Sequence, residues 1–319
     1  MKKIFSILNG NEINLIGTPL QFLNLIEYHF KYNFNYFDKP RKIFVCNAHG
    51  REIDQINFIK KKLRLNYEII HIDKKIDKLL LLIVCLFKKI LKEKFFLFVL
   101  GDYGNPFFDR FLKFSKKVIF LDDGTNIFSI KKNLKKKLSE NSNYYFFSFF
   151  NKKFLGTKRY LNNDFSFLRS KINKIKKKNR IIFLGNDFAA QKIFEKNFKK
   201  TQKFILKKFS YDKLYYFPHP KETVNSVKKR VMFKIVKSSL PFELYLILNN
   251  EIPKIVISHN STAFVSLKKI FLSKIKLINL FMKLKKSERG KNYELIFQRN
   301  LKTMNYFKKY LKINTTFIK

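Results

Sequence analysis

Residues 95–124 read FFLFVLGDYGNPFFDRFLKFSKKVIFLDDG, and two short apolar runs in this stretch flank a segment of different spacing. The runs at 95–101 and 117–123 have the length of buried strands. Residues 105–116 between them repeat apolar side chains at intervals of three and four, as a helix does. A strand, a helix and a second strand in this order predict a βα unit of a parallel sheet.

The same alternation continues in both directions along the chain, so the predicted fold class is α/β. Several predicted strands end in polar residues or glycine, at the positions where open α/β sheets bind ligands. Further strands are expected at 2–8, 41–46, 67–72, 180–185, 214–220 and 254–260, and further helices at 20–32, 187–209, 242–250 and 293–313.

A charged segment with few apolar residues, SKINKIKKKNR at 170–180, separates two sets of βα units and is predicted to be a linker. This division gives Rossmann-like domains at 1–170 and 178–300, whose strand ends face a common central cleft. Residues 301–319 are expected to form a C-terminal helix that could pack back on the first domain. Residues 141–168 have no clean period and are interpreted as a surface loop or as part of the interface between the halves.

The 319 residues include 68 Lys and Arg against 23 Asp and Glu, which gives a net charge of +45, and only ten of the basic residues are Arg. Hydrophobic residues make up 46%, so the chain can bury a core and is not a disordered polybasic tail. Abundant Lys, Phe, Ile, Asn and Tyr without Trp are as typical of an AT-rich genome as of selection for a basic surface. A functional charge would favour nucleic acid, anionic lipid or acidic substrates as partners.

No secretory signal or membrane-spanning segment is apparent in the sequence. The longest apolar run, Leu79 to Phe87, has nine residues, whereas a transmembrane helix needs roughly 20. The lysine-rich segment 74–94 is either an amphipathic helix that rests on an anionic inner leaflet or a core helix with a solvated lysine face. Cys46 and Cys85 lie in apolar runs, as buried thiols do. We expect a cytoplasmic protein, soluble or peripheral at the inner face of the cell membrane.

Asp122, Asp123 and Gly124 follow the predicted strand KVIFL, and the glycine permits a tight turn. Two neighbouring carboxylates can raise the pKa of one of them, so that one becomes a general base for a hydroxyl nucleophile. The alternative is an ordinary strand-to-helix turn in which Asp123 or Thr125 caps the next helix.

Pro218, His219 and Pro220 also follow a predicted strand, and the prolines hold the backbone extended so that the imidazole is presented rigidly. Such a histidine stabilises or protonates a leaving phosphate, or it is a loop histidine bonded to the backbone. Ser261 and Thr262, in the segment SHNST, end another strand and begin a helix. Hydroxyl and N–H groups at a helix start suit phosphate, although an ordinary N-cap has the same sequence.

Glu243 follows Pro241 at a predicted helix start, where the helix dipole favours a carboxylate and where it could accept hydrogen bonds from ribose hydroxyls. In the segment GTPLQ, Thr18 and Pro19 are predicted to be the N-cap and the first residue of a helix. Capping explains most of this segment, and Gln21 would face the cleft if the strand ends converge.

The chain contains no P-loop, no G-x-G-x-x-G, no G-x-S-x-G and no His/Cys metal spacing. It also has no D-x-D tripeptide of the kind that holds a metal in sugar-nucleotide enzymes. The candidate site is therefore expected to contain no metal and no cofactor.

Taken in order, GTPLQ, Asp-Asp-Gly, His-Pro, Pro-x-Glu and Ser-Thr resemble the bacterial sialyltransferases, in particular glycosyltransferase family 52 and the related capsule polysialyltransferases. Those families are described by acidic-acidic-Gly, His-Pro and Ser-Ser/Thr motifs, which correspond here to residues 122–124, 219–220 and 261–262. The resemblance covers about residues 1–270. It implies a GT-B fold, CMP-sialic acid as donor, inversion at the anomeric carbon and no required metal.

By the same resemblance, an aspartate of the acidic motif deprotonates the acceptor hydroxyl, and Asp122 is preferred over Asp123. His219 protonates or stabilises the departing CMP phosphate. The hydroxyl groups of Ser261 and Thr262 hold that phosphate, and Glu243 holds the cytidine ribose. The first domain then serves the acceptor and the second the donor, with closure on donor binding. The donor-binding residues implied are Gly124, Pro220, Glu243, Ser261 and Thr262.

The expected partners are a nucleotide-sugar donor and a glycan acceptor, such as lipooligosaccharide or capsule, with an anionic membrane surface as a further candidate. Two alternatives stay open. One is an envelope transferase with another nucleotide-activated donor, because His-Pro and Ser/Thr motifs also occur in enzymes that transfer glycerol phosphate or other sugars. The other is a basic nucleic-acid-binding protein, although the lysines are spread along the chain and no such motif is visible.

Overall fold

The computed structural model describes residues 11–32, 41–46, 48, 50–72, 74–91, 93, 95–101, 106–124, 127–172, 174–185, 194–220, 222, 224–282 and 293–318. The chain forms two compact units, Met1–Phe167 and Leu168–Lys319, each with its own sheet. The division falls three residues before the predicted end of the first domain at residue 170.

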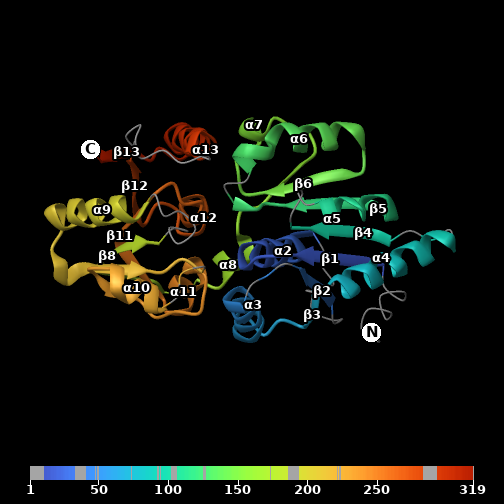
Figure 1. The fold of residues 1–319 in the computed structure, drawn as a ribbon, viewed down its shortest axis with the longest axis horizontal. Helices are drawn as coiled ribbons and strands as arrows, with labels where there is room; N and C mark the ends of the chain where they lie inside the picture. The colour runs from blue at the N-terminus through green and yellow to red at the C-terminus, as the bar shows by residue number, and fades with distance from the viewer. Residues whose placement is uncertain are drawn as a thin grey trace. The chain divides into compact units, whose positions relative to one another are not determined.

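Unit 1 is built on a seven-stranded parallel sheet with helices packed along it (Figure 1). Its strands are β1 (Glu12–Ile16), β2 (Arg41–Cys46), β3 (Tyr67–Ile72), β4 (Phe95–Leu100), β5 (Ser115–Leu121), β6 (Tyr144–Ser148) and β7 (Tyr160–Asn162). Its helices are α2 (Pro19–Tyr32), α3 (Gly50–Lys62), α4 (Lys75–Ile90), α5 (Pro106–Asp109), α6 (Ile127–Glu140) and α7 (Lys152–Leu155).

The strand order of unit 1 is β3-β2-β1-β4-β5-β6-β7, so the direction of winding reverses between β1 and β4. Parallel α/β sheets bind ligands outside the carboxyl ends of the strands at such a switch point. The α/β class and the parallel sheet are confirmed. The predicted strand at 2–8 lies outside the described residues, and the first described strand is β1.

One predicted helix of unit 1 is wrong. Residues 105–116 contain the short helix α5 and a 3₁₀ turn at Leu112–Phe114 in place of one continuous helix. Phe108, Phe111 and Phe114 are buried at a spacing of three. This spacing suits a 3₁₀ turn as well as an α-helix, so the apolar period alone could not separate the two.

The interpretation of residues 141–168 as a surface loop is also wrong. This segment supplies β6 and β7, which pair in parallel with each other and, through β6, with β5. Phe146, Phe147, Phe149 and Phe150 are all buried. Because aromatic residues point to both sides of the strand, the sequence has no alternation to mark it.

Unit 2 is built on a six-stranded parallel sheet of order β10-β9-β8-β11-β12-β13. Its winding reverses between β8 and β11. The strands are β8 (Lys176–Leu184), β9 (Leu214–Phe217), β10 (Lys234–Ile235), β11 (Glu251–Ser258), β12 (Lys276–Met282) and β13 (Thr315–Ile318). The helices are α8 (Ser166–Ser170), which contains the unit boundary, α9 (Phe194–Lys208), α10 (Val224–Arg230), α11 (Phe242–Leu248), α12 (Ala263–Ile270) and α13 (Tyr293–Tyr306).

The predicted linker at 170–180 overlaps β8. Lys176 is in register with Glu251 of β11, and the Glu251 carboxylate lies 3.1 Å from the Lys178 Nζ and 3.3 Å from the Arg180 guanidinium. The charged residues thus pair across two strands. The prediction of a helix for 301–319 is incomplete, because this segment also contains a π-helical turn at 307–311 and β13, which pairs with β12.

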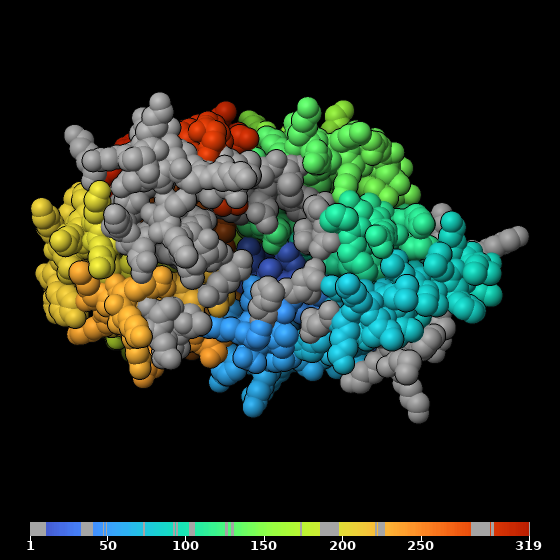
Figure 2. Space-filling model, viewed as in Figure 1, coloured from blue at the N-terminus to red at the C-terminus, as the bar shows by residue number. Residues whose placement is uncertain are grey.

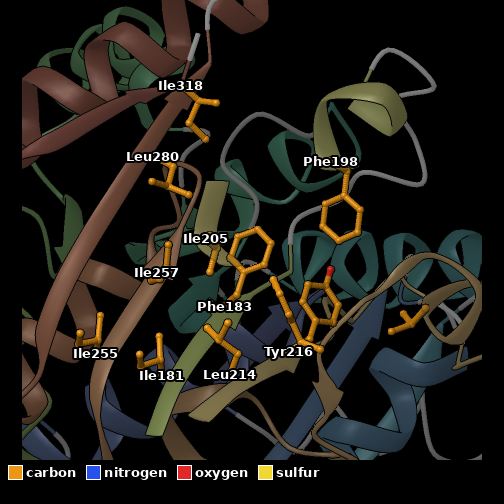
Figure 3. Packing of buried hydrophobic residues seen from close by; sticks show 12 residues of the cluster. Ile181, Phe183, Phe198, Ile205, Leu214, Tyr216, Ile255, Ile257, Leu280 and Ile318 are labelled. Atoms are coloured by element: carbon orange, nitrogen blue, oxygen red, sulfur yellow. The ribbon is translucent and has the colours of Figure 1, made fainter. Parts of the chain in front are cut away.

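Aromatic and branched side chains from β8, β9, β11 and α9 form the core of unit 2 (Figure 3). The Phe183 ring on β8 stacks on Phe198 of α9 with centroids 6.0 Å apart, and lies 5.6 Å from the Tyr216 ring on β9. Burying a side chain of this size contributes roughly 1.5–3 kcal/mol. The core therefore fixes the carboxyl ends of β8, β9 and β11 relative to one another.

None of the helices in the described ranges has an apolar stretch long enough to cross a bilayer. Cys46 and Cys85 are free thiols and both are buried, as their apolar surroundings in the sequence predict.

Candidate active site

Asp122 follows β5 and is completely buried. The Ser148 hydroxyl donates to its Oδ1 at 3.0 Å, and the backbone N–H of Phe149 donates to its Oδ2 at 2.7 Å. Both carboxylate oxygens thus bind groups at the end of β6. Asp122 connects β5 to β6 and is not positioned to contact a substrate.

Asp123 is half-buried, and its Oδ1 accepts a hydrogen bond of 2.7 Å from the Gln21 amide. The amide orientation of Gln21 is fixed from its other side, because Oε1 accepts the N–H of Gly17 at 2.6 Å. Gly124 has a φ of +62°, in the left-handed region that favours glycine. Asp123 is therefore the more exposed of the two carboxylates of the motif, whereas the preference drawn from the sequence is for Asp122.

Gln21 lies at the switch point between β1 and β4. A Cβ atom on Gly101, directly after β4, would lie 2.3 Å from Gln21 Oε1, so Gly101 leaves room for this side chain. Thr18 accepts the N–H of Gln21 at 3.3 Å, which confirms Thr18 as the cap of α2. Gln21 is buried and in contact with Asp123. Thr125, the other capping candidate, lies outside the described residues.

His219 follows β9 and is half-buried. Its backbone N–H donates to Glu222 Oε2 at 2.7 Å, and the Tyr216 hydroxyl donates to the same oxygen at 2.8 Å. Glu222 is buried, and its Oε1 lies 3.6 Å from the Arg230 guanidinium. Burial, together with the charge of Glu222, raises the pKa of Tyr216, so the phenol remains a donor. Glu222 therefore fixes the turn that carries His219 and Pro220.

Gly185, directly after β8, makes room for this network. A Cβ atom there would lie 2.4 Å from Glu222 Oε2, 2.5 Å from the Tyr216 hydroxyl and 2.7 Å from the His219 nitrogen. These distances are too short for any residue that has a Cβ atom. The close approach of β8 to the turn that carries His219 thus requires glycine.

The turn after β11 is held by half-buried His259 and by the buried side chains of Asn260 and Asn279. His259 lies 3.2 Å from the Leu280 carbonyl oxygen and 3.2 Å from the Thr201 hydroxyl. Burial lowers the pKa of His259 to about 4, so this imidazole is neutral near pH 7. Asn260 has a φ of +48° and exchanges two hydrogen bonds with Asn279, of 2.8 and 2.9 Å.

This turn presents Ser261 and Thr262, both half-buried, immediately before α12. The Ser261 hydroxyl accepts the N–H of Ala263 at 3.3 Å, so it also caps the helix. In the same first turn, the N–H of Phe264 donates to the Ser261 carbonyl oxygen at 3.1 Å and that of Val265 to the Thr262 carbonyl oxygen at 2.9 Å. The positive end of the helix dipole at this position favours an anion such as phosphate.

Glu243, in the first turn of α11, is buried and accepts a hydrogen bond from the Ser266 hydroxyl on α12. Burial raises the pKa of Glu243, and the hydrogen bond from Ser266 partly opposes this. The contact joins α11 to the helix that follows Ser261 and Thr262.

The predicted residues thus form two groups, one in each unit. In unit 1 Asp123 contacts Gln21 beside the switch point. In unit 2 His219 follows β9, and Ser261 and Thr262 follow β11, on the other side of β8. Glu243 lies on α11 and contacts α12. The sequence motifs do not include Glu222, although a carboxylate three residues after His219 is well placed to accept hydrogen bonds from the N–H groups of that turn. Within the described ranges, no three His, Cys, Asp or Glu side chains are close enough together to hold a metal ion.

The family model of the alpha-2,8-polysialyltransferases (POLYST) matches residues 77–280, which is well over half of the chain. The chain is structurally similar to the crystal structure of an alpha/beta-galactoside alpha-2,3-sialyltransferase from the luminous marine bacterium Photobacterium phosphoreum, with a TM-score of 0.54. The alignment covers 96% of this chain and 98% of that one, at 12% identity.

A second similar structure is that of Acinetobacter baumannii MurG, with a TM-score of 0.44, 8% identity and coverage of 96% and 84% of the two chains. No curated protein has a significant match to the sequence. The fold shared with the Photobacterium enzyme confirms the predicted GT-B class, with two Rossmann-like units.

Proposed function

The chain belongs to the alpha-2,8-polysialyltransferase family, and on that premise we propose that it is a metal-independent, inverting glycosyltransferase. Its donor in this proposal is CMP-sialic acid, and its acceptor is a cell-surface glycan of the lipooligosaccharide or capsule type.

The observation that supports this proposal most is the position of the three family motifs in the sheets. Asp123 follows β5, His219 follows β9, and Ser261 with Thr262 follow β11. All of them are at carboxyl ends of parallel strands, close to the switch point of their own sheet, where nucleotide-binding α/β proteins carry their ligands.

In the proposed reaction, Asp123 takes the proton of the acceptor hydroxyl as its oxygen attacks the anomeric carbon of sialic acid. The bond from that carbon to the phosphate oxygen breaks on the opposite face, which inverts the configuration. His219 donates a proton or a hydrogen bond to the departing CMP phosphate, and the start of α12 with Ser261 and Thr262 binds the same phosphate. Glu243 accepts a hydrogen bond from a ribose hydroxyl of the CMP group.

The test measures release of CMP from CMP-sialic acid by the purified full chain, with EDTA and with lactose- or sialic-acid-terminated acceptors. Wild type is expected to turn over. Asp123→Asn and His219→Ala should each lower kcat by about 10²–10⁴-fold, the range that a general acid or base contributes. Asp122→Asn is the matched control and should retain turnover at temperatures at which it is folded.

Loss of turnover in Asp122→Asn with activity retained in Asp123→Asn would reverse the assignment of the base. Turnover only with UDP-, GDP- or CDP-activated sugars would reject the donor, and loss of turnover in EDTA would reject metal independence.

A further inference from the structure

Helix α4 has two apolar faces, and the fold of unit 1 covers only one of them. Leu81, Val84 and Cys85 are buried against the unit. At 3.6 residues per turn the opposite face carries a second stripe at intervals of three and four. Its exposed members are Ile76, Leu79, Leu86, Phe87 and Ile90.

The exposure of this stripe is large. Ile90 is 75% exposed, Ile76 60%, and Leu79 and Phe87 57% each. A surface helix of a globular protein normally turns charged residues outward, so an outward apolar stripe needs a separate explanation. The atoms of α4, in cyan, lie at the surface of unit 1 in Figure 2.

The apolar surface continues beside the helix. An open groove of about 870 Å³ is lined by Leu82 and Ile83 of α4 and by Leu112 and Phe114, which precede β5. We name the exposed stripe of α4 together with this groove the α4 surface.

Positively charged side chains surround the α4 surface. Lys74, Lys75 and Lys89 are exposed on and beside the helix, and Arg110 and Lys113 are exposed at the groove. Four acidic residues of the described ranges lie nearby, and three of them are paired with lysines. They are half-buried Asp77, Asp109, which is bonded to Lys137, Glu93, 3.6 Å from the buried Lys88, and Glu140, 3.8 Å from Lys136. The margin of the α4 surface therefore carries an excess of cations.

We propose that the α4 surface docks on a phospholipid bilayer that contains anionic lipid. The apolar stripe enters the boundary between headgroups and acyl chains, and the surrounding cations contact headgroup phosphates. The charge favours this occupant over a second copy of the chain, because two copies would bring like charges together.

The experiment is co-sedimentation of the full chain with vesicles of phosphatidylcholine alone or with phosphatidylglycerol added. Wild type is expected to bind the anionic vesicles. The double variant Leu86→Ser/Ile90→Ser should reduce the partition coefficient at least about tenfold, since each large apolar side chain contributes about that factor or more. The matched control is Leu272→Ser, which changes a 62% exposed leucine in unit 2 and should bind as wild type does.

A second variant tests the cations separately. Lys75→Glu/Lys89→Glu should lower binding to anionic vesicles several-fold per lysine and make the binding less dependent on salt. Equal vesicle binding by wild type and Leu86→Ser/Ile90→Ser, or no binding by wild type, would overturn the proposal. Concentration-dependent self-association that this double variant abolishes, without vesicle binding, would assign the surface to a second copy instead. Release of CMP from a soluble donor and acceptor should be unchanged in these variants, which separates this test from that of the proposed function.

Discussion

At the scale of single residues, Glu222 holds the backbone of His219 through a charged hydrogen bond in a buried setting. Glu222→Ala removes the acceptor of two donors and should lower kcat roughly ten- to a hundredfold by letting His219 move. Glu222→Gln keeps one acceptor oxygen and should recover much of that loss. The measurements are kcat, KM and thermal unfolding of both variants. If Glu222 has a structural role alone, both variants melt at a lower temperature but keep the wild-type kcat below the unfolding transition.

A second residue-scale feature is Glu12 at the amino end of β1. Its carboxylate lies 2.8 Å from the His29 Nε2 and 2.6 Å from the Arg41 guanidinium. Although burial acts to raise it, the contact with His29 and the charge of Arg41 hold the pKa of Glu12 at about 2, against an ordinary value of 4.5. Burial also lowers the pKa of His29 itself. The ionised carboxylate therefore stabilises the fold above pH 4.5, and this contribution is lost as the pH falls toward 2.

Glu12→Gln should lower the free energy of unfolding near pH 7 by on the order of 2–3 kcal/mol and remove this part of the acid dependence. Urea unfolding from pH 7 to pH 2 measures both effects. The control is Glu294→Gln, which alters an exposed glutamate of α13. If the free energy of unfolding of Glu12→Gln falls between pH 7 and pH 2 as steeply as that of wild type, the ion pairs do not stabilise the fold.

The sequence locates the acidic motif but does not tell its two aspartates apart. Their difference depends on Ser148 and the N–H of Phe149, which lie at the end of β6 in a segment without a readable period. The roles of His219, Ser261 and Thr262 stay predictions. Their strand-end positions follow from the alternation of strands and helices.

At the scale of secondary-structure elements, the close approach of β8 to the turn after β9 depends on Gly185. Gly185→Ala should destabilise unit 2 and lower kcat, because its methyl group would displace Glu222 or the His219 backbone. Gly50→Ala is the matched control, since a Cβ atom at Gly50 meets nothing within 4 Å. Thermal unfolding and CMP release of the two variants should differ; similar small effects would mean that the turn adapts without cost.

The strands that the sequence predicts best have apolar runs with clear ends. The runs at 41–46 and 67–72 coincide with β2 and β3 residue for residue. Two strand segments are not recognised because charges or aromatic residues hide the pattern: the first half of β8, and β6. In both places the missing information is the partner strand, which supplies Glu251 in one case and completes the aromatic core in the other.

At the scale of the whole molecule, each unit has its own sheet and its own core. Multidomain chains often unfold in more than one step. Scanning calorimetry should show two transitions, of which Asp122→Asn lowers one by several degrees and Gly185→Ala lowers the other. A single transition that both substitutions shift equally would show that the units unfold as one.

The division into two α/β halves is readable from composition and period, because the alternation restarts after the charged segment. The strand order is not readable, since it depends on which neighbours pair across the sheet, and it is this order that puts the switch points beside Gln21 and Gly185.

Among the residues that the structure describes, the two sheets end in short strands at three of their four margins: three residues in β7, two in β10 and four in β13. A strand this short offers few free N–H and C=O groups on which a strand of another molecule can assemble. For a chain with 39 phenylalanines this is a protection against fibril-like aggregation. The remaining margin is the six-residue β3, YEIIHI, so intermolecular strand pairing at high concentration should begin there.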